Sequence, residues 1–222
     1  MPHDEGAHAH DHPHPGTPDH PEPDPDIAVM EQALRELLIE KGVFSAVELQ
    51  RAIEAMERRS HATGAAVVAR AWVDPGFRDQ LMTHANSAVA SFGVTMGVAE
   101  LTAIENTPDC HNLVVCTLCS CYPRALLGIP PKWYKTKSYR ARAVLEPRAV
   151  LAEFGLVLPQ ATRVRVHDST ADLRFIVVPE RPPGTDGWSE ERLARLVTCD
   201  SLIGVSRALD PSELREHPAP SA

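Results

Sequence analysis

The residues of this chain with the clearest chemical potential are three closely spaced cysteines, Cys116, Cys119 and Cys121. The chain contains five cysteines, and the other two are Cys110 and Cys199. An odd number, with three thiols in one short segment, makes a poor disulfide framework because the three cannot all reach bridging geometry in a tight loop. Clustered thiols in a reducing compartment more often hold a metal ion. The sequence therefore predicts a metal site at this cluster.

The spacing alone leaves three interpretations of the cluster open. A structural zinc site would need a fourth ligand, and no second Cys-x-x-Cys pair follows. Three residues could complete such a site: Cys110, His111 and Cys199. A redox pair at Cys116 and Cys119 should open a helix after a strand, and Pro123 and the third thiol fit that poorly. The third interpretation is a catalytic metal other than zinc.

The composition excludes several classes of protein. At 222 residues, with 43% hydrophobic and 23% charged residues, the chain can form a globular core. A net charge of −8 argues against a nucleic-acid surface, which needs clustered Lys and Arg. The sequence has neither a run of about 18 apolar residues nor a basic region followed by an apolar stretch at its N-terminus. We therefore expect a cytoplasmic protein that binds neither nucleic acid nor a membrane.

The composition divides the chain into four segments. Residues 1–25 carry six histidines among Pro, Asp, Gly and Glu, and this His-rich tail is predicted to be disordered. Its histidines either collect divalent metals weakly or are simply solvated. Residues 26–95 are predicted to form a helical arm, residues 96–210 a metal-binding catalytic domain, and residues 211–222 a C-terminal tail. Helices first and strands later predict an α+β fold, in which the arm precedes a layered α/β globular domain with largely antiparallel strands.

The helical arm is predicted as three helices. Asp26 can cap the first, whose apolar residues recur with the helical period. Ser45 and Glu48 form a capping-box pattern for the second. An alanine-rich third stretch covers about residues 62–90 and is broken near residues 74–76. These apolar stripes need a partner surface, which is either another subunit or the rest of this chain.

Elements of the catalytic domain must position the cysteines. Residues 113–115 are typical of a short buried strand that leads directly into the cluster. Alternating apolar residues predict two more strands, near residues 164–166 and 173–177, paired antiparallel around residues 168–169. A short helix is predicted at residues 149–154, and a last helix after a capping serine, Ser189.

The run Val115–Pro123, with the sequence VCTLCSCYP, resembles the metal-binding motif of nitrile hydratase α subunits. The similarity continues through four further segments: Leu127–Lys135, Tyr139–Arg142, Glu153–Gly155 and Arg181–Trp188. It covers residues 105–205 closely and residues 27–90 more loosely. On these motifs the chain is identified as a member of the cobalt-type nitrile hydratase α family, which includes the related γ subunit of thiocyanate hydrolase.

The resemblance implies a metal centre with a defined ligand set. Cys116 corresponds to the axial thiolate, and Cys119 and Cys121 lie in the metal's equatorial plane with the deprotonated backbone nitrogens of Ser120 and Cys121. In this family the sulfur corresponding to Cys119 is a sulfinic acid and that corresponding to Cys121 a sulfenic acid. Threonine at the position of Thr117 accompanies cobalt in the family, so the resemblance implies about one cobalt(III) ion per chain.

The activity implied by the resemblance is the hydration of a small-molecule nitrile to the corresponding amide. The metal's open position would polarise the carbon–nitrogen triple bond, and the catalytic residues would be Cys121, whose sulfenate oxygen could attack the carbon, and Cys119. The resemblance also implies a β-type partner subunit, possibly split into two chains, whose arginines hold the oxidised sulfurs. A cobalt-loading activator protein is the other partner implied.

Two residues depart from the usual nitrile hydratase pattern. Arg124 stands where the family has a tryptophan that lines the substrate pocket, and Gly97 stands where it has a pocket glutamine. The segment Tyr122–Arg124 and the His-rich tail instead resemble the γ subunit of thiocyanate hydrolase, which converts thiocyanate to carbonyl sulfide and ammonia. Arginine at this position also fits three-subunit nitrile hydratases acting on bulky substrates such as the nucleoside toyocamycin.

Two alternatives to a nitrile hydratase therefore stay open. The first is a thiocyanate hydrolase, in which Arg124 at the pocket would face an anion. The second is not an enzyme but a metal-storage protein or metallochaperone, suggested by the His-rich tail and the thiolate cluster. Such a protein would not need Trp133, Trp188 or the long region after the cysteines, and cobalt-dependent turnover by the assembled complex separates the classes.

Deletion of residues 1–24 tests the prediction for the tail. Folding and turnover of the assembled, fully metallated enzyme should change little, because the segment lacks apolar side chains for a core. Cobalt loading is the property we expect to fall when cobalt is scarce, as measured by elemental analysis beside the full-length chain. A large loss of turnover in the metallated, truncated enzyme would contradict this expectation.

Overall fold

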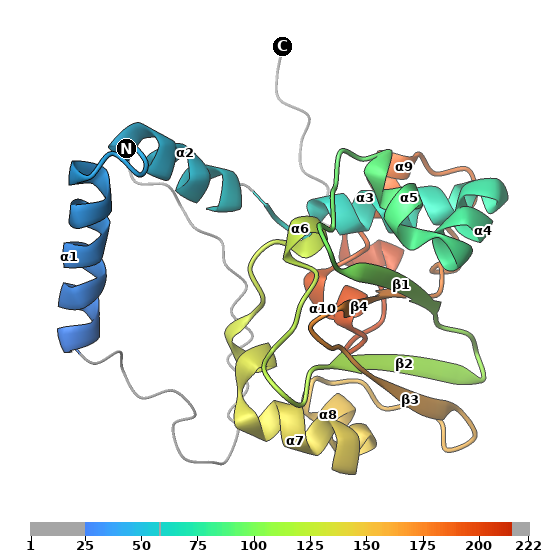
Figure 1. Ribbon diagram of the computed structural model, residues 1–222. Coiled ribbons are helices and arrows are strands. Elements are labelled where there is room, and N and C mark those ends of the chain that lie inside the picture. The colour runs from blue at the N-terminus through green and yellow to red at the C-terminus, as the bar shows by residue number, and fades with distance from the viewer. Residues whose placement is uncertain (1–24, 58, 215–222) are drawn as a thin grey trace.

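The computed structural model describes residues 25–57 and 59–214 and mixes helices with two pairs of strands (Figure 1). The predicted His-rich tail lies outside the described residues apart from Pro25, and so does the predicted C-terminal tail beyond Leu214. No helix in the described part of the chain is long and apolar enough to cross a membrane.

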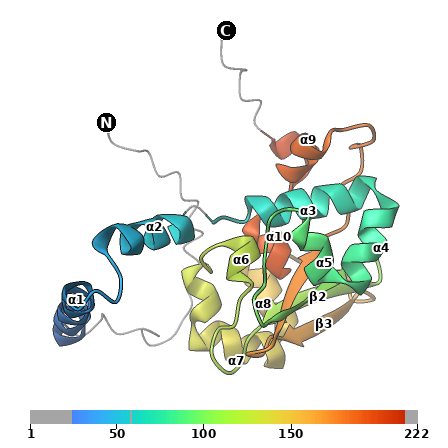
Figure 2. The same cartoon turned by 45° about the horizontal axis from the view of Figure 1, so that its top comes forward.

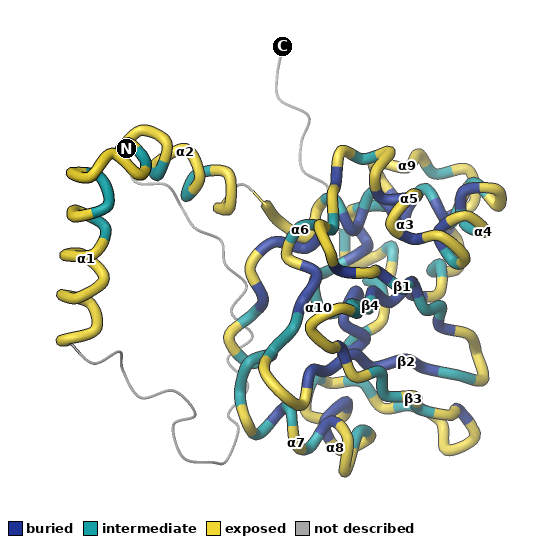
Figure 3. Tube along the Cα trace, in the orientation of Figure 1, coloured by how far each residue is buried: buried dark blue, intermediate teal, exposed yellow. Residues whose placement is uncertain are grey.

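Two helices form an arm to one side of the globular body in both views, α1 (Pro25–Glu40) and α2 (Ala46–Glu57) (Figures 1 and 2). The predicted capping box is present: the Glu48 amide donates to Ser45 Oγ at 3.2 Å, and the Ser45 amide donates to the Glu48 carboxylate at 2.7 Å. The arm is exposed along most of its length (Figure 3). Its Met30 is 69% exposed, so the described part of this chain does not cover its apolar stripe.

The alanine-rich stretch belongs to the body and not to the arm. It forms α3 (Ala62–Val73), α4 (Pro75–Thr83) and α5 (Ala85–Ala90), and the first break lies where it was predicted, at Asp74. The Asp74 side chain accepts a hydrogen bond from the amide of Phe77 at 3.0 Å and so caps α4. Side chains of α3 are fully buried in the core. The predicted arm of residues 26–95 is therefore confirmed only over its first two helices.

In the described part of the chain, four strands form two parallel pairs. β1 (Glu100–Glu105) pairs with β4 (Leu173–Val178), and β2 (Cys110–Val115) pairs with β3 (Arg163–Asp168). The prediction of largely antiparallel strands is wrong. The predicted alternation is present in β3, whereas the last three residues of β4 are all buried. Alternation also does not identify the pairing partner. β3 and β4 each pair with an earlier strand and not with each other.

The long segment between β2 and β3 makes the parallel pairing possible, because parallel strands need a crossover of a dozen or more residues. It contains α6 (Arg124–Leu127), the 3-10 turn η1 (Lys132–Lys135), α7 (Lys137–Leu145) and α8 (Pro147–Glu153). The last of these is the predicted short helix, and Gly155 follows it with a φ of +81°. The crossover begins at the cysteines, so it also carries the candidate site.

Two short helices and a turn complete the described chain. Ser189 caps α9 (Glu190–Ala194), as predicted. Its side chain accepts a hydrogen bond from the backbone amide of Arg192, the third residue of the helix. A further helix, α10 (Cys199–Ile203), was not predicted since it is a single turn. Thr198 caps it in a capping box. The 3-10 turn η2 (Pro211–Glu213) ends the described residues.

A buried network of polar side chains fixes β2 to the elements around it. Asn106 accepts from the Asn112 amide at 2.7 Å, and its own amide group contacts His111 Nδ1 at 3.2 Å. His111 Nε2 lies 2.7 Å from the Gly204 carbonyl, which can only accept, so this nitrogen carries the ring proton. His167 Nε2 contacts Asn112 Oδ1 at 2.9 Å. The network therefore holds the strand that leads into the cysteines against β1, β3 and α10.

Replacing Gly204 with alanine should destabilise the fold strongly. Gly204 has a φ of +89°, and a Cβ there would lie 2.0 Å from the Asn112 carbonyl oxygen. The left-handed conformation alone costs about 1–2 kcal/mol for alanine, and the clash with β2 adds to that cost. Gly155→Ala is the matched control, since its φ is +81° with nothing within 4 Å of the added carbon. Equal losses in free energy of unfolding, measured by urea denaturation, would contradict this packing.

Candidate metal centre

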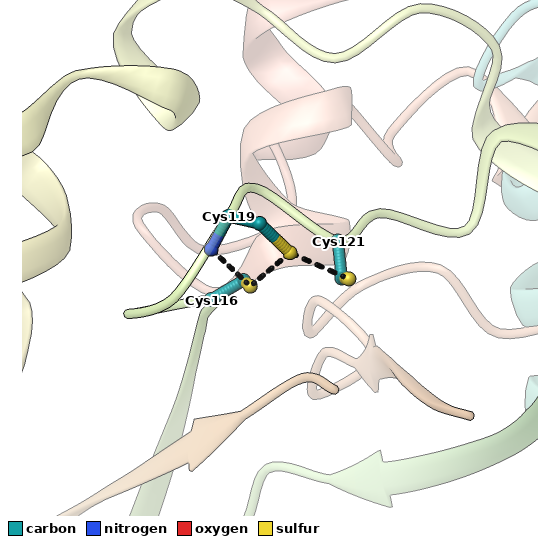
Figure 4. A group of neighbouring side chains, drawn as sticks. All are labelled: Cys116, Cys119 and Cys121. Atoms are coloured by element: carbon teal, nitrogen blue, oxygen red, sulfur yellow. Dashed lines mark hydrogen bonds between the residues drawn. The ribbon is translucent and has the colours of Figure 1, made fainter. Parts of the chain in front are cut away.

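The three predicted cysteine ligands converge directly after β2 (Figure 4). The Sγ atoms of Cys116 and Cys119 lie 3.6 Å apart, and those of Cys119 and Cys121 lie 3.1 Å apart. All three sulfur atoms lie within 4.8 Å of one another. Cys116 is fully buried, whereas Cys119 is exposed and Cys121 is partly buried. The cluster therefore has a closed inner side at Cys116 and an open outer side.

The backbone of the loop turns its amides toward the same point. The amides of Cys119 and Ser120 lie 3.3 Å and 3.2 Å from the Cys116 sulfur. Ser120 has a φ of +102°, and no other non-glycine residue in the described part of the chain has a positive φ. A positive φ is costly for a residue with a side chain and often marks a functional constraint. Three sulfurs and inward-facing amides are a donor set that fits a metal ion preferring soft and nitrogen ligands.

The charges of the thiols differ within the cluster. Two effects on the pKa of the Cys116 thiol oppose each other. Burial raises this pKa, but hydrogen bonds from the backbone amides of Cys119, Cys121 and Ser120 outweigh burial and lower the pKa to about 7. Burial raises the pKa of the Cys121 thiol to about 12, and its contact with Cys119 and the Cys116 charge raise it as well. The buried Cys116 is thus the sulfur most ready to be a thiolate, and a metal cation would stabilise the deprotonated form of the others.

Three side chains anchor the loop from outside it. The backbone amide and hydroxyl of Thr117 both donate to the Asp168 carboxylate, at 2.9 Å and 2.5 Å. The Tyr134 hydroxyl donates to the Cys121 carbonyl at 2.8 Å, and the Tyr139 hydroxyl donates to the carbonyl of Val114 at 2.7 Å. Both tyrosines are buried. The loop is therefore held in place by β3, η1 and α7 even without a metal.

Sequence reasoning did not assign these anchoring roles. Asp168 was placed in a turn between antiparallel strands, whereas the parallel register puts it opposite Val115, one residue before the cysteine loop. Tyr134 and Tyr139 lie in segments that carried the family resemblance, and that was the only signal for them. An anchor that acts across the fold has no local spacing rule to reveal it.

The other candidate ligands lie apart from the cluster. Within the described residues, the only group of three or more metal-ligating side chains consists of the three loop cysteines. His111 is bound in the buried network, and the Cys199 sulfur contacts the Tyr122 hydroxyl at 3.2 Å. A four-ligand zinc site is therefore not formed by the side chains described. The redox alternative is not supported either, because no helix opens at Cys116 and the next one begins at Arg124.

Arg124 is exposed at the first position of α6, three residues after the last cysteine. Gly97 is also exposed and has a φ of +65°. The rest of the described chain therefore covers neither side of the comparison: Arg124 and Gly97 are both accessible from outside it.

The fold and the loop match one family of proteins. A family model of the nitrile hydratase α chain matches residues 25–206. The α subunit of the low-molecular-weight cobalt-containing nitrile hydratase of Rhodococcus rhodochrous is 49% identical over 189 residues, which cover 84% of this chain and 91% of that protein. The γ subunit of thiocyanate hydrolase from Thiobacillus thioparus is 43% identical over 190 residues, covering 80% of this chain and 78% of that protein.

Solved structures give the same result. A mutant Fe-type nitrile hydratase from Comamonas testosteroni Ni1 matches with a TM-score of 0.78 and 42% identity, covering 87% of this chain and 97% of that chain. A thiocyanate hydrolase mutant in which tryptophan replaces an arginine matches with a TM-score of 0.77 and 38% identity, covering 88% and 99%. A mixed helix-and-strand body with a Cys-x-x-Cys-x-Cys loop thus defines a class of metal-binding subunits. This chain belongs to the nitrile hydratase α-chain family.

Replacing Asp168 with alanine should loosen the metal loop. The change removes both hydrogen bonds to Thr117, and loss of a partner that orients a metal ligand typically lowers metal affinity about 10–100-fold. Cobalt retained after a chelator challenge, measured by elemental analysis, should fall accordingly. Asp168→Asn, which keeps one acceptor oxygen, should lie between the alanine variant and the native chain.

Asp172→Ala is the matched control, because Asp172 is an exposed acidic residue whose hydrogen bonds come from its backbone. Its cobalt retention should equal that of the native chain. Equal retention by the Asp168 and Asp172 variants would mean that the carboxylate of Asp168 does not support the loop.

Proposed function

We propose that this chain is the metal-binding catalytic subunit of a cobalt nitrile hydratase, which adds water to a nitrile to form an amide. The observation that carries the proposal is the convergence of three sulfurs and inward-facing amides from one six-residue segment. Iron-type and cobalt-type relatives share this fold, so the fold does not select the metal. Cobalt is supported by Thr117 and by relatives described as cobalt-containing at 49% and 47% identity.

The ligands we propose are the sulfurs of Cys116, Cys119 and Cys121 and the backbone nitrogens of Ser120 and Cys121. When bound, cobalt(III) supplies Lewis acidity toward the nitrile nitrogen. Cys116 lies on the closed inner side, so a nitrile would approach from the open side, where Cys119 and Cys121 lie. Exposure also makes these two sulfurs accessible to oxidation. We propose a sulfinic acid at Cys119 and a sulfenic acid at Cys121, for which molecular oxygen would be the oxidant. The Cys121 oxygen would add to the nitrile carbon as the nitrile nitrogen takes up a proton, and water would then release the amide and restore the sulfenic acid.

A second subunit is part of this proposal. The relatives are named as subunits, and in this chain the loop residue Leu118 is 86% exposed beside the open side of the centre. Exposed apolar side chains next to a reactive site favour a covering partner, which would exclude water and bring cations to the oxidised sulfurs. We propose a β-type subunit, whole or split into two chains, together with an activator that loads cobalt.

Thiocyanate hydrolysis is the second candidate function. Arg124 favours it, because a cation with several hydrogen-bond donors suits an anion such as thiocyanate better than a small apolar nitrile. The 43% identity to a thiocyanate hydrolase γ subunit also supports this alternative. The two activities use the same loop and differ in the substrate pocket.

The test of the proposed function is the complex purified from its own cells grown with cobalt. It should contain about one cobalt per chain and convert a nitrile to its amide, with loss of turnover in preparations grown without cobalt. Peptide mass analysis should show the segment with Cys119 and Cys121 heavier by up to about three oxygens, and Cys116 unmodified. Stoichiometric zinc without cobalt in the active complex would contradict the proposal.

Changing Arg124 to tryptophan should shift specificity toward small apolar nitriles. Losing one charge-assisted contact to the native substrate is worth about 1.5–3 kcal/mol, so kcat/KM for that substrate should fall about ten- to a hundredfold. Acrylonitrile, a nucleoside nitrile and thiocyanate are the substrates to compare. Arg163→Trp is the control, because Arg163 is an exposed arginine at the opposite end of β3 from Asp168.

Equal changes of kcat/KM across the three substrates would remove Arg124 from the substrate pocket. The substrate with the largest loss in the tryptophan variant identifies the native class, because the lost contact is specific to it. A larger loss for thiocyanate than for either nitrile would favour the second candidate function.

A further inference from the structure

Tyr122 directly follows Cys121, the last cysteine of the metal loop, and its side chain turns into the core. Tyr122 is only 5% exposed, whereas Leu118 in the middle of the loop is 86% exposed. Because the peptide bond that joins Cys121 to Tyr122 is planar and stiff, the position of one residue limits the position of the other. Contacts that fix the Tyr122 side chain therefore also restrain the Cys121 backbone.

The ring of Tyr122 packs against the ring of Tyr134. The two ring centroids lie 5.2 Å apart and the rings are inclined by 66°, which is the favoured edge-to-face geometry. Tyr134 is fully buried, and its hydroxyl is the donor to the Cys121 carbonyl. Cys121 is therefore held in two ways, through the chain by Tyr122 and through its carbonyl by Tyr134.

The hydroxyl of Tyr122 reaches a different element, the helix α10. It lies 3.2 Å from the sulfur of Cys199, the first residue of that helix. Burial raises the pKa of the Cys199 thiol to about 11, so this thiol keeps its proton near neutral pH. A neutral thiol and a neutral phenol can each donate and accept. The contact is therefore a hydrogen bond between two neutral groups.

The helix α10 is itself fixed at both ends. Its N-terminus is closed by the capping box of Thr198 and Ser201. At its C-terminal end the Gly204 carbonyl lies 2.7 Å from Nε2 of His111, which belongs to β2. The helix thus contacts the strand that leads into the metal loop and, through Cys199, the residue that leaves it. It is a rigid point to which the exit of the loop is attached.

We propose that Tyr122 is a positioning residue for the metal loop, anchored to α10 by Cys199 and bracing Tyr134 against the Cys121 carbonyl. Cys121 supplies both a sulfur and a backbone nitrogen to the proposed ligand set, so a shift of this residue displaces two donor atoms at once. Cys199, which the sequence left open as a fourth zinc ligand, has this anchoring role instead. The inference rests on the proposed function for the metal that the loop binds.

Hydrogen exchange of the full-length, metal-free chain tests the contact, with the segment 116–123 as the region measured. Tyr122→Phe removes the hydroxyl and Cys199→Ala removes the sulfur. Each should make exchange in this segment about two- to tenfold faster, as expected for the loss of one hydrogen bond. The double variant should exchange no faster than either single variant, because both changes remove the same contact. Cys199→Ser keeps a hydrogen-bonding group of similar size and should match the native chain.

Cys110→Ala is the matched control, because Cys110 is also a partly buried free cysteine but lies at the start of β2. Its exchange in the segment 116–123 should equal that of the native chain. Equal acceleration by Cys199→Ser and Cys199→Ala would reduce Cys199 to a packing role and overturn the proposal. Additive effects in the double variant would overturn it too, and so would an equal acceleration in the buried helix α3, which would mean a general loss of stability.

Cobalt retention separates this inference from the proposed function. In the native complex, Tyr122→Phe and Cys199→Ala should each release cobalt to a chelator about two- to tenfold faster, and Cys199→Ser should not. The predicted exchange pattern in a chain that binds no cobalt would reject the proposed function and leave the positioning role. An active cobalt complex in which neither variant alters exchange or cobalt release would reject the positioning role and leave the function.

Discussion

Bringing three sulfur atoms within 4.8 Å of one another inside six residues requires a turn that an ordinary backbone does not make. Ser120 provides it with a φ of +102°. A strained conformation of this kind persists only where the surroundings over-determine it. Here the loop is held at Thr117 by Asp168 and at the Cys121 carbonyl by Tyr134. The metal geometry therefore depends on contacts made by elements far away in the sequence.

Parallel pairing brings those contacts together. β2 and β3 run in the same direction, so their carboxyl ends meet, with Val115 opposite Asp168. An antiparallel pair would have placed the start of β3 beside the metal loop instead. The crossover between the two strands carries both anchoring tyrosines, Tyr134 in η1 and Tyr139 in α7. The same connection thus supports the candidate centre through Tyr134 and Tyr139.

The sequence was sufficient for the features that depend on neighbours in the chain. The cysteine cluster, the buried strand before it, the capping box at Ser45 and the cap at Ser189 each follow from local spacing, and the structure confirms them. Strand direction was predicted wrongly as antiparallel, because the side-chain period is the same in parallel and antiparallel strands.

The sequence was insufficient for features that depend on long-range packing. The helical arm was predicted too long, since an alanine-rich helix has the same periodicity whether it packs on its own chain or on another. The role of Asp168 was missed because it depends on which strand β3 joins. A protein with this loop consequently needs its fold to reveal what supports the loop, although its sequence already predicts which atoms would bind a metal.

The central claim is that one loop supplies the ligands of one cobalt ion, and X-ray absorption at the cobalt edge of the native complex tests it most directly. We predict a first shell of about three sulfur and two nitrogen scatterers, as the cysteine side chains and backbone amides of this loop would provide. A shell of nitrogen and oxygen alone, as histidines of the tail would provide, would contradict it.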